Sequence, residues 1–139
     1  MATTNKVKVM HILVTNDDGV HAPGLLALVE TMHQCGDVSV VAPDRDWSGG
    51  GHVKTLNRPL RVQEIKLADG TLAYASDGAP SDCVALAIMG LLDRPVDMIV
   101  AGINPAANLG HDVTYSGDGN GYHGRHHLGN SWRRCFPGW

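Results

Sequence analysis

The chain has 139 residues, of which 43% are hydrophobic, and carries a formal net charge of -3 at neutral pH. This length and composition favour one globular domain with a hydrophobic core over a disordered or fibrous protein. The slightly acidic balance argues against the broad basic surface of nucleic-acid binders. The apolar runs are too short for a signal peptide or a membrane span, and the three cysteines lack the spacing of metal ligands. We therefore expect a cytoplasmic protein whose partners include neither a membrane nor a nucleic-acid duplex.

An apolar run that ends in two adjacent carboxylates is the most informative stretch. Residues 12–14 are followed closely by Asn16, Asp17, Asp18 and Gly19. A strand buried on both faces is typical of a parallel sheet, which presents ligand-binding residues at the carboxyl ends of its strands. Neighbouring carboxylates repel each other unless a cation or donors compensate them, and Mg²⁺ and Mn²⁺ prefer oxygen ligands. Asp17 and Asp18 are therefore candidate metal ligands, although the same residues also suit a plain turn that caps the following helix.

A helix and a second strand follow this turn. Pro23 suits a first helical turn, and apolar residues at helical spacing predict the buried face of the helix: Leu25, Leu28, Val29 and Met32. Residues 38–42 are expected to form the second strand. Because a βαβ unit forces parallel pairing, the loops that follow its two strands are expected at the same edge of the sheet.

The loop after the second strand is polar and rich in glycine. Ser48 offers a neutral oxygen to a metal, and the backbone amides of Gly49 and Gly50 can approach a phosphate closely. His52 is a candidate proton donor. The alternative for the whole loop is a surface loop without a binding role.

The remaining elements bring a third polar loop to the same edge. Residues 59–67 and 71–74 predict a hairpin, with Asp69 and Gly70 in its turn. A helix over residues 78–92 follows, with Asp82 complementing its positive start. Its expected core-facing stripe is Val84, Ala87, Ile88 and Leu91. A strand over 97–101 then leads to Asn104, so three loops after parallel strands converge and predict a ligand site in an α/β fold.

A series of motifs in a fixed order resembles one known family. The motifs lie at residues 12–19, 41–45, 48–49, 51–52, 58–60, 77–78, 82–84, 102–104, 108–110 and 112–117. In this order they resemble the SurE family of survival-protein nucleotidases. The resemblance implies a Rossmann-like α/β fold with a mainly parallel sheet and flanking helices. It also implies a metal-dependent phosphatase that acts on nucleoside 5′-monophosphates, with a further 3′ activity to be tested, and a homodimer or tetramer.

The resemblance also assigns roles to individual residues. It implies one Mg²⁺ or Mn²⁺ per subunit, and its ligands would be Asp17, Asp18, Ser48 and Asn104. The two carboxylates are also the catalytic candidates, and the nucleophile, water or a carboxylate, stays open. The residues that would hold the phosphate are Asn16, Gly49, Gly50, Asn108 and Ser116.

The sequence departs from the family pattern after residue 117. Residues 118–139 show neither helical nor strand periodicity, and they contain the chain's single Phe and two of its three Trp. Codons for this segment, read one base later, permit Thr-Val-Met-Ala and a continuation close to that of the family. We therefore hypothesise a frameshift, with an incomplete nucleotidase domain at 1–117 and a non-homologous, disordered tail at 118–139. The coding DNA tests this hypothesis.

Two consequences follow from that hypothesis, and three alternatives stand beside it. Without the family's C-terminal part, we expect an unpaired sheet edge and impaired activity in this chain. The tail could instead form a soft-metal site from His123, His126, His127 and Cys135. For the whole chain, the alternatives to an enzyme are a phosphate-binding or nucleotide-binding module and a nonfunctional fragment.

Overall fold

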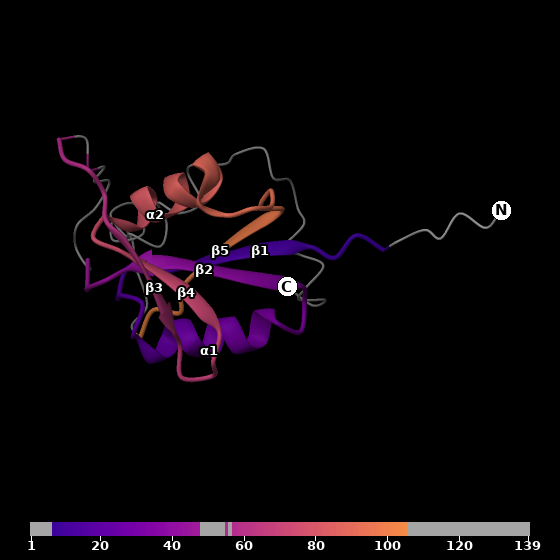
Figure 1. Cartoon of the computed structure of the whole chain (residues 1–139). Coiled ribbons are helices and arrows are strands. Elements are labelled where there is room, and N and C mark those ends of the chain that lie inside the picture. The colour runs from indigo at the N-terminus through magenta and orange to yellow at the C-terminus, as the bar shows by residue number, and fades with distance from the viewer. Residues whose placement is uncertain (1–6, 48–54, 56, 106–139) are drawn as a thin grey trace, which may run out of the picture.

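The computed structural model describes residues 7–47, 55 and 57–105. The described residues contain a five-stranded sheet with the order β3-β4-β2-β1-β5, and helices lie on both of its sides (Figure 1). The strands are β1 (His11–Thr15), β2 (Asp37–Pro43), β3 (Val62–Lys66), β4 (Leu72–Ser76) and β5 (Met98–Ala101). The predicted boundary at residue 117 and the tail behind it lie outside the described residues.

The sheet is mainly parallel, as the sequence predicts. Strand β1 pairs in parallel with β2 and β5, and β2 pairs in parallel with β4; β3 is antiparallel to β4. Ile12 lies at the centre, opposite Val38 on one side and Met98 on the other. The carboxyl ends of four strands therefore share one edge of the sheet, which we call the carboxyl edge: the ends of β1, β2, β4 and β5.

Two helices cover opposite faces of this sheet. Helix α1 (Pro23–Met32) connects β1 to β2, and α2 (Pro80–Leu86) lies between β4 and β5. The connection from β1 to β2 and the connection from β4 to β5 run in opposite directions along the sheet. Because both connections are right-handed, their helices must lie on opposite faces of the sheet, as Figure 1 shows. The predicted stripe of α1 is confirmed, because all four of its residues are buried: Leu25, Leu28, Val29 and Met32. No helix in the described ranges is both long and apolar enough to cross a membrane.

The second helix is shorter than predicted. It ends at Leu86 and continues as a π-helix, η1 (Ala87–Leu91), in which Gly90 has a φ of 128°. A π turn is wider than an α turn, so side chains after it no longer follow the 100° spacing of an α-helix. The predicted core position of Ile88 is therefore wrong, since its side chain is 40% exposed, whereas Val84 and Ala87 are buried as expected.

The hairpin also differs at its start. Strand β3 begins at Val62 rather than at residue 59. The backbone just before it bonds to Asp77 at the end of β4: the Arg61 N–H donates to Asp77 Oδ1 at 2.8 Å. The predicted turn is confirmed, because Leu67 N–H donates to the Thr71 carbonyl at 2.9 Å and Gly70 has a φ of 86°.

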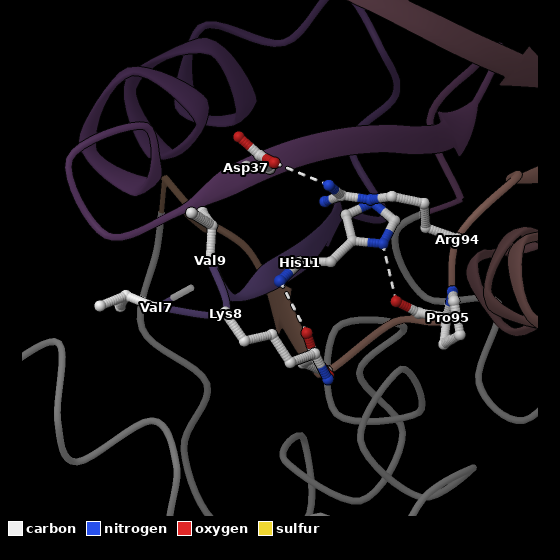
Figure 2. A pocket seen from close by; sticks show the side chains of 8 residues that line it. Val7, Lys8, Val9, His11, Asp37, Arg94 and Pro95 are labelled. Atoms are coloured by element: carbon white, nitrogen blue, oxygen red, sulfur yellow. Dashed lines mark hydrogen bonds and ion pairs between the residues drawn. The ribbon is translucent and has the colours of Figure 1, made fainter. Parts of the chain in front are cut away.

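A cavity of about 440 Å³ lies at the amino ends of the parallel strands, opposite the carboxyl edge (Figure 2). The charged groups that line it are paired within the protein. His11 lies buried in its wall, where its ring nitrogens contact the Pro95 carbonyl at 2.9 Å and the Ser39 hydroxyl at 2.7 Å. Arg94 binds Asp37 at 2.8 Å. These contacts tie the starts of three strands together, so we assign this edge a structural role.

Replacing Asp97 by asparagine is expected to lower the free energy of unfolding at neutral pH and to have no effect in acid. The Lys8 ammonium donates to Asp97 Oδ1 at 2.8 Å and the His11 backbone N–H donates to Oδ2 at 2.9 Å, and both bonds hold the pKa of Asp97 below its ordinary 3.8. A depressed folded-state pKa stabilises the protein above the unfolded-state pKa, and this contribution disappears as the pH falls through the folded-state pKa. Urea unfolding of both proteins from pH 7 down to about pH 2 measures it. A difference in stability that stays constant over this range would contradict the assignment.

Candidate functional site

The acidic loop after β1 is a tight turn closed by an amide. Asn16 Oδ1 accepts the Gly19 backbone N–H at 3.2 Å, and its Nδ2 donates to the Gly19 carbonyl at 2.9 Å. Gly19 has a φ of 105°, which favours glycine. The alternative of a tight turn is thus confirmed, and the N-cap of α1 is Ala22 rather than Asp17 or Asp18. Asn16 fixes the loop that carries Asp17 and Asp18, and its contact with phosphate stays a prediction.

The loop after β2 lies directly against this turn. The Trp47 N–H donates to the Asp17 carbonyl, and the Val20 N–H donates to the Pro43 carbonyl, both at 2.7 Å. A Cβ on Gly19 would lie only 3.1 Å from the Arg45 carbonyl carbon, so the two backbones are in close contact. The predicted meeting of these two loops is confirmed. Ser48, which follows Trp47, lies outside the described residues, as do other predicted site residues: Gly49, Gly50 and His52.

The loop after β5 joins from the other side of β1. The Gly102 N–H donates to the Thr15 carbonyl at 3.1 Å, and the Ile103 N–H donates to the Gly24 carbonyl at 3.4 Å. These bonds fix the backbone that leads to the half-buried Asn104. The structure therefore places Asn104 and the acidic loop on adjacent strand ends. The predicted phosphate-binding residues Asn108 and Ser116 lie outside the described residues.

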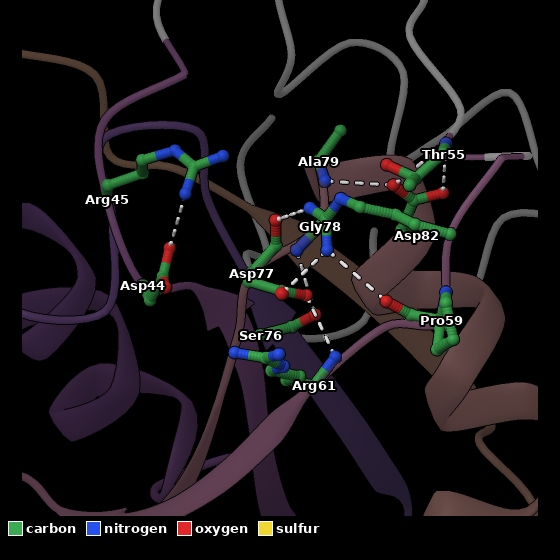
Figure 3. Close-up of polar contacts among 11 residues, drawn as sticks. Asp44, Arg45, Thr55, Pro59, Arg61, Ser76, Asp77, Gly78, Ala79 and Asp82 are labelled. Carbon is green, nitrogen blue, oxygen red and sulfur yellow. Dashed lines mark hydrogen bonds and ion pairs between the residues drawn. The ribbon is translucent and has the colours of Figure 1, made fainter.

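Sequence reasoning missed a fourth loop at the carboxyl edge, the one after β4 (Figure 3). Its Asp77 accepts the Arg61 backbone N–H, and the Arg58 guanidinium donates to Asp77 Oδ2 at 2.6 Å. The bond from Arg61 and, to a lesser extent, the bond from Arg58 lower the pKa of Asp77. The Asp44 N–H donates to the Ser76 carbonyl at 2.7 Å and joins this loop to that of β2. The sequence signal that could have revealed this loop was the strand 72–76 before it. The pairing of that strand with β2, which brings the loop to the carboxyl edge, is not encoded in local periodicity.

The donor groups at the carboxyl edge fit a hard cation. Asp17 is buried to 5% exposure beside the half-buried Asp18, and Asn104 adds an amide oxygen. Within the described ranges no group of three or more His, Cys, Asp or Glu side chains could hold a metal. Cys83 is a poor candidate for a ligand or nucleophile, because burial raises the pKa of its thiol and keeps it protonated.

Comparisons with known proteins identify the family of this chain. Residues 12–121 match the family model described as "Survival protein SurE". A protein of Herpetosiphon aurantiacus named 5′-nucleotidase SurE is 60% identical over 108 residues, which cover 78% of this chain and 42% of that protein. A protein of the same name from Chloroflexus aggregans is 58% identical and is covered to 43%. This chain thus spans about two fifths of the length of these relatives.

A solved structure supports the same relationship at the level of the fold. The crystal structure of the SurE protein from Aquifex aeolicus superposes with a TM-score of 0.68 at 42% sequence identity, covering 80% of this chain and 44% of that one. The match includes the acidic loop, the glycine-rich segment and the loop after β5, because the family model extends from residue 12 to 121. On this evidence the chain belongs to the SurE family.

Proposed function

We propose that this chain carries the metal-binding and phosphate-binding part of a phosphatase that hydrolyses nucleoside 5′-monophosphates. The observation that supports the proposal most is the convergence of the acidic loop after β1 with the Asn104 loop after β5. The name 5′-nucleotidase, carried by relatives at 58–60% identity, supports the choice of substrate. Hydrolysis of 3′-monophosphates belongs to the same proposal.

In this proposal the carboxyl edge binds one Mg²⁺ or Mn²⁺. Asp17, Asp18 and Asn104 would supply oxygens to it together with Ser48. When bound, the cation would polarise the phosphoryl group and lower the pKa of a hydroxylic nucleophile. Asn16 holds the acidic loop in its turn, so that the carboxylates keep their place without a change of backbone. The backbone of Gly49 and Gly50 and the side chains of Asn108 and Ser116 are proposed to hold the remaining phosphate oxygens.

The assembly and cellular location remain parts of the proposal. Strand β5 is an edge strand of the sheet formed by the described residues, and its sequence Met-Ile-Val-Ala is apolar. Such an edge favours pairing with further protein. We accordingly propose a homodimer or tetramer. We separately propose a cytoplasmic location, as expected from the sequence.

Phosphate release from adenosine 5′- and 3′-monophosphate, with Mn²⁺ and after chelation, tests the function. The proposal expects weak release, in line with the impaired activity expected from the sequence, and this release should require Mn²⁺ and stop on chelation. Binding of the nucleotide without release, even with Mn²⁺ present, would favour the phosphate-binding module. A chain without a cooperative unfolding transition would favour the nonfunctional fragment.

A further inference from the structure

An arginine and a tryptophan lie stacked in the loop after β2. The Arg45 guanidinium carbon lies 4.9 Å from the centre of the Trp47 ring. At this distance a guanidinium is attracted to the face of an aromatic ring. Neither residue belongs to the metal-binding or phosphate-binding groups proposed above, so the pair has no function in the site as described so far.

Backbone contacts hold this pair against the acidic loop. The Trp47 N–H donates to the Asp17 carbonyl at 2.7 Å. A Cβ on Gly19 would lie 3.1 Å from the Arg45 carbonyl carbon, so the two loops also touch at this residue. Both members of the pair are therefore attached to the loop that carries the candidate metal ligands Asp17 and Asp18.

The two stacked side chains differ in exposure. The Trp47 side chain is half-buried and its Nε1 atom is buried, so the indole ring is held by the surrounding protein. The Arg45 side chain is 56% exposed, and one edge of its guanidinium lies 3.6 Å from the Asp44 carboxylate (Figure 3). The protein thus presents a planar cation, supported by an aromatic ring, beside the acidic loop.

A nucleobase is the part of the proposed substrate that suits this surface. Guanidinium groups stack on planar π systems, and bases bind to proteins by stacking on arginine planes and aromatic rings. The phosphate, ribose and base of a nucleoside monophosphate are joined in a row. A phosphate bound at the acidic loop therefore leaves the base free to contact a neighbouring part of the carboxyl edge.

We infer that Arg45 and Trp47 form the base-binding surface of the proposed nucleotidase site. The base stacks on the guanidinium of Arg45, and Trp47 supports the guanidinium from its other side. The inference rests on the proposed function, because that proposal supplies the position of the phosphate. It adds to that function a means of distinguishing nucleotides from other phosphate esters.

Adenosine 5′-monophosphate and ribose 5-phosphate separate the contribution of the base from that of the phosphate. Both carry a phosphate ester on the ribose 5′ oxygen, and only the first carries a base. For the unchanged chain with Mn²⁺, we expect the KM for phosphate release to be about tenfold lower for the nucleotide, within the range that one stacked base contributes.

Arg45→Lys keeps the positive charge and removes the planar group. We expect it to raise the KM for adenosine 5′-monophosphate about fivefold, while kcat and the KM for ribose 5-phosphate stay within about twofold of the unchanged chain. Trp47→Leu removes the support of the guanidinium and should produce the same selective loss. Because Trp47 is half-buried, the Tm of both variants is measured, and the exposed Arg45 provides the test that leaves packing intact.

Arg94→Lys is the matched control, because Arg94 is also an exposed arginine paired with an aspartate, Asp37, but lies at the opposite edge. It should leave the KM for both ligands within about twofold, as expected for a distant site. Equal KM values for the two ligands in the unchanged chain would overturn the inference and leave the proposed phosphatase standing. Equal losses for both ligands in Arg45→Lys would do the same, since they would show attraction by charge alone.

A chain that releases phosphate from neither ligand would contradict the proposed hydrolysis, and the base-binding surface is then tested by calorimetric binding of the same two ligands. Tighter binding of the nucleotide that Arg45→Lys abolishes would support the surface. Equal binding of the two ligands would overturn it, and no binding of either would overturn both proposals.

Discussion

Replacing Asp17 by asparagine is expected to lower the affinity for Mn²⁺ by at least about a hundredfold and to abolish metal-dependent phosphate release. Asp17 is 5% exposed and adjoins a second carboxylate, Asp18. A carboxylate within about 4 Å of a cation contributes several kcal/mol even at the screening found near a protein surface, and about 2.7 kcal/mol corresponds to a hundredfold in affinity. Calorimetric titration with Mn²⁺, alongside phosphate release from adenosine 5′-monophosphate, measures both effects.

Asp44→Asn is the matched control for this variant. Asp44 is an exposed carboxylate just after β2 at the same edge, and it pairs with Arg45 at 3.6 Å. The substitution removes the same charge from the same side of the molecule, and exposed pairs of this kind contribute little. We expect Mn²⁺ affinity within about twofold of the unchanged chain. Equal losses in both variants would show that the general charge of the edge, rather than ligation by Asp17, attracts the cation.

Replacing Gly24 by alanine is expected to destabilise the protein by up to about 2 kcal/mol and to weaken Mn²⁺ binding about tenfold. Alanine in a helix normally gains about 1 kcal/mol over glycine. Here a Cβ would overlap the carbonyl oxygen of Ile103, a backbone atom that cannot turn aside, and overpacking of this kind costs about 1–3 kcal/mol. The shift of Ile103 also moves its neighbour, Asn104, a proposed metal ligand. Urea unfolding and Mn²⁺ titration measure the two effects.

Ala27→Gly, at an exposed position of the same helix, is the control for Gly24→Ala. It should cost about 1 kcal/mol through helix propensity alone and leave Mn²⁺ affinity unchanged. A gain of stability in Gly24→Ala would mean that the close contact with Ile103 is not present in solution. If the Gly24→Ala variant is destabilised but binds Mn²⁺ with unchanged affinity, Asn104 is not a ligand of the metal.

Local periodicity was sufficient to predict the first half of the fold. Strand β1, helix α1 and strand β2 follow one another with unbroken spacing, and the parallel pairing of β1 with β2 follows from their connection. The prediction failed at Ile88 because this residue lies in the π-helix η1, whose backbone departs from helical geometry at Gly90, where φ is 128°. The place of β4 beside β2 could not be predicted, because strand pairing between distant segments leaves no local pattern.

The candidate site also has parts that the sequence predicted and parts that it did not. The acidic loop and the loop carrying Asn104 were predicted from their position after apolar strands, since parallel strands bring their carboxyl ends together. Asp82 was predicted only as a residue at a helix start, where it accepts the Ala79 N–H; its second bond, to the Thr55 N–H, was not predicted. Its bond to Thr55 joins residues on either side of the β3-β4 hairpin, and only the folded backbone brings them together.

Crystals of the unchanged chain grown with Mn²⁺ and inorganic phosphate would reveal the proposed metal site through the anomalous scattering of manganese. We predict one anomalous peak at the carboxyl edge, about 2.1 Å from oxygens of Asp17, Asp18 and Asn104, the distance expected for a small hard cation. We also expect a phosphate oxygen in the same coordination shell. A manganese peak bound by other residues, or phosphate bound away from the acidic loop, would refute the proposed site.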